Sequence, residues 1–397
     1  MVTNFCRQRI IKFLQGTGVT LVEGEKTLVN GNPKAKIIIK NPKIYKDIIL
    51  KGELGVGEGY RNDWWETPDL IELFVTILRA RLNKKVVNFA AFPHKLKAKF
   101  LNMQSVVRSK RVAKEHYDVG NKFYEKMLGK TMQYTCAFWD NAKTLDQAQI
   151  NKMRLICEKA HLKPGDHVLE LGGGWGMLAK FIAEEYDCHV DSYNISEEQV
   201  KYAQEQCKNL KKGKVNIICS DFRNAKGVYD KVISVGLCEH VGYKNYRTLM
   251  ITAYNCLVEG GLFVMHTIGK NFSTIMTDRF FDKYIFPGGM IPSQHQLAAA
   301  SEELFIIESL NNIGPDYAKT LEQWRKNFLK HWPEFKDKWD ENHKIKYDNT
   351  FKRTWEYYLA TCEAAFEARN LQLYQNVYVK DKGAKGKYKP VVKPFKG

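Results

Sequence analysis

The stretch V-L-E-L-G-G-G-W-G, from Val168 to Gly176, decides the fold of the second half of this chain. Its first four residues form an apolar run that predicts a buried strand. Glycines follow at positions 172, 173, 174 and 176, and a helical pattern begins directly after them. A strand, a glycine-rich turn and a helix N-terminus let a ligand approach the backbone closely, with free N–H groups directed at it.

The spacing within this turn selects among the ligands that such loops bind. The turn lacks the Lys-Ser/Thr of a phosphate loop and the G-x-G-x-x-G spacing of a dinucleotide fingerprint. The E-x-G-x-G pattern from Glu170 to Gly174 instead indicates S-adenosylmethionine (SAM), with Glu170 placed to take the ligand's amino group or ribose. The alternative is a glycine-rich turn that merely allows tight packing.

Strands and helices alternate from about residue 150 onward. The pattern predicts strands at 167–171, 188–193, 214–220, 230–235 and 261–267, and helices at 145–161, 175–186, 196–210 and 243–257. Such alternation predicts an α/β fold with a parallel, Rossmann-like sheet and helices on both faces. Ligands of these sheets bind outside the carboxyl ends of the strands.

A smaller α+β domain is predicted over residues 1–85. The pattern gives helices at Phe5–Leu14, Pro42–Leu50 and Asp69–Leu82, and short strands at Val19–Val22 and Ile37–Ile39. A length of 397 residues exceeds a usual single core, so two domains are the expectation.

The charge of the chain points to a polyanionic partner. The formal net charge is +18, which favours either nucleic acid or an anionic membrane surface, and composition alone does not choose between them. A basic linker over 86–115 carries interleaved apolar residues, so it suits a membrane interface or docking on its own protein. The Lys-rich tail over 379–397 is expected to be flexible.

Cysteine usage and hydropathy bear on the compartment. The nine cysteines are scattered and form no C-x-x-C pair, which argues against a disulfide framework and a structural zinc site. No N-terminal signal pattern is present, and no apolar run approaches the roughly 18 residues that span a bilayer. We therefore expect a cytoplasmic protein whose membrane contact is peripheral.

Several further segments resemble one family. They are H-Y-D-V-G-N-K-F-Y (His116–Tyr124), M-Q-Y-T-C-A-F-W (Met132–Trp139), S-V-G-L-C-E-H-V-G (Ser234–Gly242) and H-T-I-G (His266–Gly269). With the glycine loop, they resemble the bacterial cyclopropane-fatty-acyl-phospholipid synthases, relatives of the mycolic acid cyclopropane synthases. The stretches Gly52–Glu66 and Tyr357–Tyr374 are similar to the two-domain synthases specifically, so the resemblance runs from about residue 35 to 378. The catalytic domain is therefore predicted over 116–378.

The resemblance implies addition of a methylene group from SAM across the cis double bond of a phospholipid acyl chain. Methyl transfer to the alkene leaves a carbocation-like centre, and loss of a proton from the added methyl closes the ring. Such a site holds the sulfonium near the alkene, excludes water and provides a base. In this family the base is thought to be a bound bicarbonate ion. The resemblance also implies that the enzyme associates with the anionic phospholipid surface on the inner face of the cell membrane. It further implies that the enzyme is a homodimer.

The resemblance assigns residues to both ligands. The bicarbonate cage maps to Cys136, Glu239, His266, the backbone of Ile268, and Tyr317. SAM contacts map to Tyr134, Thr135, Glu170, Gly172, Gly173, Gly174, Asn194, Ile195 and Gln199, with Asp221 and Phe222 near the adenine. Without this context, a Glu-His pair after a strand is more often a helix cap or a salt bridge. Cys362 is sometimes treated as the family's active-site cysteine, but the chemistry needs no covalent enzyme intermediate, which favours a structural cysteine.

The chain departs from the family pattern in two places. Gly173 stands where the family has Cys, and Ser192-Tyr193-Asn194 stands where it tends to have Gly-Val-Thr. A backbone contact of the glycine loop should survive the first change, whereas the second weakens the expected ribose contact. Asp191, inside an otherwise apolar strand, is a candidate substitute for that contact.

Other functions remain open from the sequence. Within the family, these are addition of a methyl branch to a fatty acyl chain and small-molecule N-methylation. A nucleic-acid methyltransferase would suit the charge, but no recognition module or Asn/Asp-Pro-Pro-Tyr-like motif supports it, so we expect no nucleic-acid partner. A lipid-binding protein with a retired SAM fold is the alternative outside enzymes.

Overall fold

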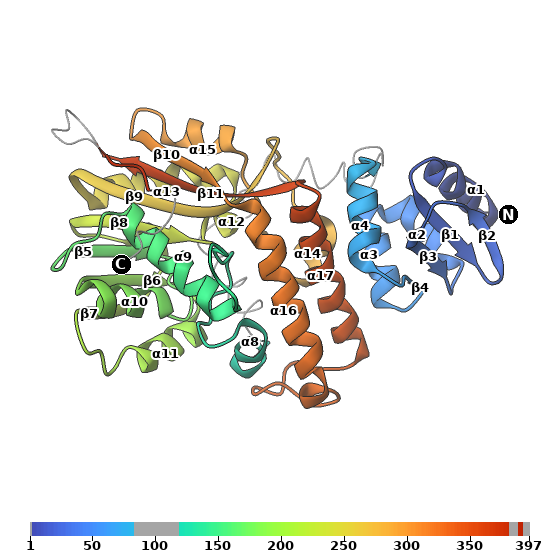
Figure 1. Ribbon diagram of the computed structural model, residues 1–397, viewed down its shortest axis with the longest axis horizontal. Coiled ribbons are helices and arrows are strands. Elements are labelled where there is room, and N and C mark those ends of the chain that lie inside the picture. Colours follow the sequence, from blue (N-terminus) through green and yellow to red (C-terminus); the bar gives the residue numbers. More distant parts are fainter. Residues whose placement is uncertain (1, 83–118, 381–387, 392–397) are drawn as a thin grey trace. The chain divides into compact units, whose positions relative to one another are not determined.

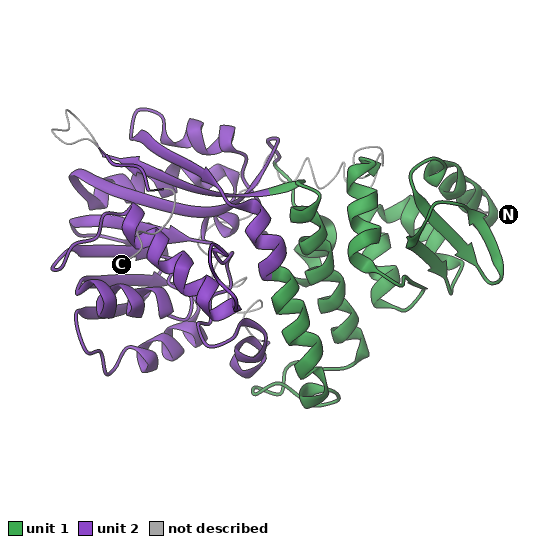
Figure 2. Ribbon diagram, in the orientation of Figure 1, with its two compact units in different colours: residues 1–101, 275–287, 321–371 green, residues 102–274, 288–320, 372–397 purple. Residues whose placement is uncertain are grey.

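The computed structural model in Figure 1 describes residues 2–82, 119–380 and 388–391. The predicted linker over 86–115 lies outside the described residues, as do the first three residues of the motif that begins at His116. The chain forms two compact units, coloured separately in Figure 2. Unit 1 contains residues 1–101, 275–287 and 321–371, and unit 2 contains residues 102–274, 288–320 and 372–397. A single boundary near residue 85 therefore does not separate them, because two later segments join the N-terminal residues.

Unit 2 is built on a seven-stranded sheet in the order β10-β11-β9-β8-β5-β6-β7, which can be followed in Figure 1. Its strands are β5 (His167–Leu171), β6 (His189–Asn194), β7 (Lys214–Cys219), β8 (Tyr229–Val235), β9 (Leu257–Lys270), β10 (Ile306–Asn312) and β11 (Leu371–Val379). Strands β5 to β9 pair in parallel, which confirms the α/β fold and all five predicted strands. The antiparallel pair β10 and β11 was not predicted.

The helices of unit 2 include the four that the sequence predicted. These are α9 (Leu145–Lys159), α10 (Met177–Tyr186), α11 (Glu197–Gln206) and α13 (Tyr246–Cys256). Thr144 and Ser196 cap α9 and α11 by accepting hydrogen bonds from backbone N–H groups of the first turn, which fixes where both helices begin. The shorter elements are α8 (Asn121–Leu128), η2 (Phe222–Asn224), α12 (Cys238–Val241), η3 (Tyr243–Asn245) and α15 (Gln294–Ser301).

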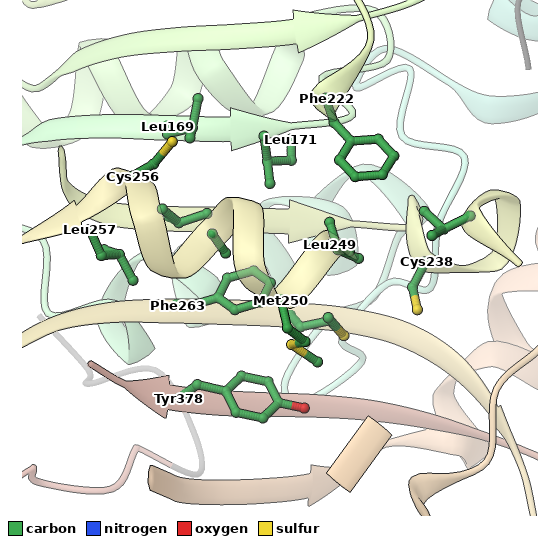
Figure 3. Packing of buried hydrophobic residues seen from close by; sticks show 14 of the residues in the cluster. Leu169, Leu171, Phe222, Cys238, Leu249, Met250, Cys256, Leu257, Phe263 and Tyr378 are labelled. Atoms are coloured by element: carbon green, nitrogen blue, oxygen red, sulfur yellow. The ribbon is translucent and has the colours of Figure 1, made fainter. Parts of the chain in front are cut away.

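Alternate residues of the strands face two different helix layers. Val168, Val264 and Val377 pack with residues of α9 and α10 on one face of the sheet. Leu169, Phe263 and their neighbours pack with α13 on the other face, in the cluster that Figure 3 shows. Because side chains alternate along a strand, His266, two residues after Val264, lies on the face that α9 covers.

Unit 1 contains a four-stranded sheet in the order β2-β1-β3-β4. Its strands are β1 (Val19–Glu23), β2 (Lys26–Val29), β3 (Asn32–Ile39) and β4 (Trp65–Glu66). Its helices are α1 (Val2–Leu14), α2 (Lys43–Lys51), α3 (Glu53–Arg61), α4 (Leu70–Arg79), α14 (Arg279–Tyr284), most of α16 (Gly314–Phe335) and α17 (Asn349–Glu367). Across the described parts of both units, none of the helices combines the length and the apolar character that crossing a bilayer demands.

The glycines of α3 have a packing reason. A Cβ atom at Gly57 would lie 2.3 Å from the ring of Phe280, and one at Gly59 would lie 2.1 Å from the Ile44 side chain. Between them, Glu58 accepts hydrogen bonds from Lys283 at 2.6 Å and from Tyr284 at 2.9 Å. This stretch therefore joins α3 to α2 and α14 inside unit 1.

Candidate active site

The glycine loop joins β5 to α10, as the sequence predicted. Gly172, Gly174 and Gly176 have φ angles of 89°, 53° and 78°, which lie in the left-handed region that favours glycine. The N–H groups of Gly172 and Gly173 donate to the Tyr193 carbonyl at 2.9 and 3.1 Å, so the loop is tied to the end of β6. Gly173 has no positive φ, and its lack of a side chain needs another explanation.

Ser192 provides that explanation. A Cβ atom at Gly173 would lie 1.9 Å from Ser192 Oγ and 2.9 Å from Glu170 Oε2. Ser192 Oγ instead donates to Glu170 Oε2 at 2.5 Å. Burial raises the pKa of Glu170 to about 7, and the Ser192 hydroxyl and Lys152 oppose that shift. The two departures from the family pattern are thus coupled, since Ser192 fills the space in which a side chain at 173 would lie.

The side-chain amide of Asn194 is hydrogen-bonded to the glycine loop, so its N–H groups are not free to contact a ribose. Its Nδ2 donates to the Gly174 carbonyl at 2.8 Å and to Gln199 Oε1 at 3.0 Å, while its Oδ1 accepts from Ser196 N–H at 3.1 Å. Ile195, between these partners, is half-buried. Asp191 lies apart from this group: it accepts from the Tyr229 hydroxyl at 2.7 Å and from the Asn216 amide at 3.3 Å. Its carboxylate therefore ties β6 to β7 and β8.

Asp221 and Phe222 follow β7, and both are buried. The Asp221 carboxylate accepts from Arg223 Nε at 2.7 Å and from Arg223 Nη2 at 2.8 Å. Phe222 belongs to the apolar cluster with Leu171 and Phe263, as Figure 3 shows. Both side chains therefore have structural partners, and an adenine contact would add to these.

The segment from Gly236 to Glu239 connects the two sets of candidates. A Cβ atom at Gly236 would lie 2.6 Å from Thr135 Cγ2, and one at Gly172 would lie 2.9 Å from Leu237 Cβ. The Gly236 N–H also donates to the His266 carbonyl at 2.9 Å. Residues from the glycine loop, the Tyr134–Thr135 segment and β9 therefore meet at the end of β8.

Glu239 and His266 form the core of the predicted cage. Glu239 Oε1 accepts from the Ile268 N–H at 2.7 Å, whereas its buried Oε2 has no hydrogen-bond partner among the described residues. Burial raises the pKa of Glu239 to about 7, and the Ile268 N–H and the Thr267 hydroxyl oppose that shift. The neighbouring residue Cys238 holds this part of α12 in place, because the Cys238 side chain lies in the core cluster of Figure 3.

His266 is held as a neutral ring. Its Nδ1 lies 3.1 Å from Gln375 Nε2, and donation from this amide leaves the ring proton on Nε2. The buried Nε2 has no hydrogen-bond partner within the described ranges. Burial lowers the pKa of His266 well below its usual value, and the charges of Lys152 and Lys159 lower it further. The site thus presents one buried donor, His266 Nε2, and one buried acceptor, Glu239 Oε2, that no group in the described residues uses.

Cys136 lies in the loop between α8 and α9, and Tyr317 lies on α16, both within unit 2. Both are buried, and Tyr317 lies in the first turn of α16. The segment after Cys136 is tied to the first two turns of α16, because Ala137 N–H donates to Thr320 Oγ1 at 3.1 Å and Trp139 N–H donates to Asp316 Oδ2 at 3.2 Å. Burial raises the pKa of the Cys136 thiol, which keeps it protonated.

Cys362 differs from the other candidates in location. It lies on α17 in unit 1, whereas all the others belong to unit 2. Burial raises the pKa of its thiol, and Asp278 adds to the shift. A protonated thiol is a poor nucleophile, consistent with a structural role.

Sequence reasoning missed three polar residues of this site. Gln375 holds His266, and Gln149 and Lys152 on α9 bind the segment that carries Thr135. No spacing in the sequence joins them to the motifs, because their partners lie 14 to 109 positions away. The one sequence signal for these three residues was their polar character on a helix or strand whose neighbouring residues are buried.

Comparisons with known proteins agree with this geometry. The family model described as mycolic acid cyclopropane synthetase matches residues 104–376. The chain is 42% identical over 357 residues to cyclopropane-fatty-acyl-phospholipid synthase of Escherichia coli, covering 88% of this chain and 89% of that protein. Mycolic acid cyclopropane synthase CmaA1, complexed with SAH and CTAB, matches with a TM-score of 0.61 and 25% identity, over 68% of this chain and 98% of that one. Coclaurine N-methyltransferase, at 19% identity and a TM-score of 0.66 over 82% of this chain and 99% of that one, shares the fold.

The sheet, the glycine loop and these neighbours define a SAM-dependent methyltransferase. More specifically, the chain belongs to the mycolic acid cyclopropane synthetase family, which includes the bacterial cyclopropane-fatty-acyl-phospholipid synthases.

Proposed function

We propose that this enzyme transfers a methylene group from SAM to the cis double bond of unsaturated acyl chains in membrane phospholipids, forming a cyclopropane ring. Similarity to the E. coli synthase across 88% of the chain supports the substrate class. The observation that carries the chemistry is the pair of buried, unused atoms Glu239 Oε2 and His266 Nε2.

The loop after β5 fits SAM. Its three left-handed glycines expose backbone on the side where Gly174 meets open space, and Glu170 lies at the end of the strand beside it. When bound, SAM supplies an electrophilic methyl group. Thr135, which lies against Gly236, and Tyr134 before it would complete the cofactor site and place it beside the segment that leads to Glu239.

The unused atoms fit bicarbonate. This ion offers both an O–H donor and acceptor oxygens, which matches an acceptor at Glu239 Oε2 and a donor at His266 Nε2. When bound, bicarbonate would accept the proton whose loss closes the ring. Two full negative charges side by side would repel, but with its pKa at about 7 the Glu239 carboxyl can share one proton with the ion in a single hydrogen bond, without transferring it.

The protein's own part in the reaction is to orient groups and to exclude water. His266 stays neutral and donates from Nε2, Ile268 N–H holds Glu239 in place, and Gln375 fixes the ring of His266. Burial of these groups keeps water from a reactive centre on the acyl chain. Cys136 and Tyr317, by the resemblance, would add two further contacts to the ion.

We also propose peripheral association with the anionic inner face of the cell membrane, and a homodimer. The net charge of +18 supports the first, since each basic group near an anionic surface adds roughly 1 kcal/mol of attraction. The second rests on the family resemblance alone.

The test is incubation of the enzyme with SAM and vesicles of unsaturated phospholipid, followed by mass spectrometry and NMR of the acyl chains. We expect a gain of one methylene per double bond, loss of the olefinic protons and appearance of cyclopropane protons. Retained unsaturation with the same mass gain would instead identify a methyl-branch-forming enzyme. Methylation of an added amine without change in the lipid would identify an N-methyltransferase.

A second test isolates Glu239. The variant Glu239→Gln should bind SAM normally in a calorimetric titration while its turnover collapses, because Gln keeps the contact with Ile268 N–H but cannot share a proton. Unchanged turnover would contradict the role assigned to this carboxyl.

A further inference from the structure

Two buried lysines of α9 are not used in the chemistry described above. Lys152 and Lys159 are both 0% exposed. They lie seven residues apart, and therefore on the same face of the helix. That face packs on the side of the sheet to which His266 belongs. Two ammonium groups are thus enclosed between α9 and the strands that form the site.

The hydrogen-bond partners of both lysines are neutral. Lys152 Nζ donates to Thr135 Oγ1 at 3.0 Å and also to Gln133 Oε1. Lys159 Nζ donates to Asn311 Oδ1 at 2.6 Å. In the part of the chain that the structure describes, neither forms an ion pair with a carboxylate, although Glu170 acts on Lys152 from farther away.

Burying an ammonium group without a counter-charge is costly, and neutral side chains could make the same hydrogen bonds. Burial accordingly lowers the pKa of each lysine to about 7, so a nearby anion would favour the charged form of both side chains. A positive charge enclosed in this way is favoured once an anion lies nearby. The candidate site for such an anion is the cage at Glu239 and His266.

Lys152 is connected to the cage through the segment that carries Thr135 and Cys136. Together with Gln149, one turn earlier on α9, it makes four hydrogen bonds to Gln133 and Thr135. Thr135 in turn abuts Gly236, whose N–H donates to the His266 carbonyl. The charge of Lys152 also acts directly on Cys136.

Lys159 is connected to the cage from the other side of His266. Its partner Asn311 pairs in register with Gln375 across β10 and β11. The Gln375 amide is the group that holds His266 Nδ1 at 3.1 Å. The two lysines therefore approach the same histidine by two separate routes.

We propose that Lys152 and Lys159 are positioning residues that make the cage of Glu239 and His266 selective for an anion, by placing two buried positive charges behind His266. The inference rests on the proposed bicarbonate base and deepens it. It assigns to α9 the charge that stabilises the ion, while Glu239 and His266 supply the direct hydrogen bonds.

The experiment measures the thermal unfolding midpoint in CO2-depleted buffer as sodium bicarbonate is added, with sodium chloride at matched ionic strength as the reference. Four variants are compared with the wild type: Lys152→Met, Lys152→Gln, Lys159→Met and the control Lys231→Met. Lys231 is a suitable control because it lies on β8, is half-buried and also has a pKa lowered by burial, but it is outside the site. Circular dichroism and the midpoint without bicarbonate establish that each variant folds.

We expect the wild type and Lys231→Met to show the same saturable rise in midpoint with bicarbonate. For both Met variants, the bicarbonate concentration that gives half of the maximal rise in midpoint should be at least tenfold higher than for the wild type, because a buried charge near the ion is lost. Lys152→Gln, which keeps a donor without the charge, should match Lys152→Met and provides a second variant if the Met form does not fold. Rescue by Gln would show that hydrogen bonding alone matters and would overturn the inference.

The outcomes separate this inference from the proposed function. A wild type that shows no response to bicarbonate would refute the bicarbonate base, and with it the inference. A wild-type response that all lysine variants share at the same concentration would leave the base intact and refute the role of the lysines.

Discussion

The coupling between Gly173 and Ser192 can be tested by exchanging the side chains. In the chain as it stands, Ser192 Oγ occupies the position 1.9 Å from where a Cβ at Gly173 would lie. The variant Gly173→Cys forces these atoms apart without backbone strain, because Gly173 has no positive φ. Overpacking of this kind costs about 1–3 kcal/mol, and the displaced groups are Ser192 and Glu170, at the edge of the cofactor loop.

The variant Ser192→Gly should weaken SAM binding through a lost hydrogen bond, whereas Gly173→Cys acts through overpacking. It removes the 2.5 Å hydrogen bond to Glu170 Oε2 and leaves a buried carboxyl without that donor. A hydrogen bond to a charged group contributes about 1.5–3 kcal/mol. If that energy orients Glu170 toward SAM, the affinity for SAM falls by roughly 10-fold to 100-fold.

The double variant Gly173→Cys/Ser192→Gly should recover most of both losses. Removing Oγ opens the space that the Cys side chain needs, and the Cβ position 2.9 Å from Glu170 Oε2 brings a weak S–H donor near the same carboxyl. The coupling energy should therefore be about 1–3 kcal/mol in favour of the double variant. Calorimetric titration with SAM measures the affinities, and urea unfolding measures the stabilities. Strict additivity of the two single effects would refute the idea that Ser192 replaces the missing side chain.

Three further predictions concern Glu239, Cys362 and Gly57. Because burial raises the pKa of Glu239 from 4.5 to about 7, its carboxyl favours folding at low pH, and that contribution is lost as the pH rises from about 4.5 through about 7. In Glu239→Gln, the free energy of unfolding should fall by up to about 3 kcal/mol less than in the wild type over this pH range, because Gln does not titrate. Equal pH dependence of urea unfolding in both proteins would contradict the raised pKa. Cys362→Ala should change turnover on unsaturated vesicles by less than about twofold, since its protonated thiol takes no part in the chemistry, and a large drop would restore a catalytic role. Gly57→Ala places a Cβ 2.3 Å from Phe280 and should destabilise unit 1 by about 1–3 kcal/mol in urea unfolding, and an unchanged free energy of unfolding would contradict the clash.

The sequence by itself determined the central strand, the cofactor loop and the helix after it. The predicted strand at 167–171 is β5 with the same bounds, and α10 begins where the glycines end. These elements were predictable because their signals are local: an apolar run, a cluster of glycines and a helical pattern lie within a few residues of one another. The motifs also identified Glu239 and Ile268, which the structure joins by a 2.7 Å hydrogen bond.

Only the tertiary structure decided what surrounds those residues. It adds β10 and β11 to the sheet, and so brings Gln375 to His266 across 109 positions of the chain. It places Ser192 beside Gly173, and it buries Lys152 and Lys159 on the face of α9 that packs against the sheet. None of these contacts has a local signal, because each depends on which strands become neighbours and which face a helix covers. The sequence therefore selected the candidate residues of the site, and the packing of distant segments set their burial and their hydrogen bonds.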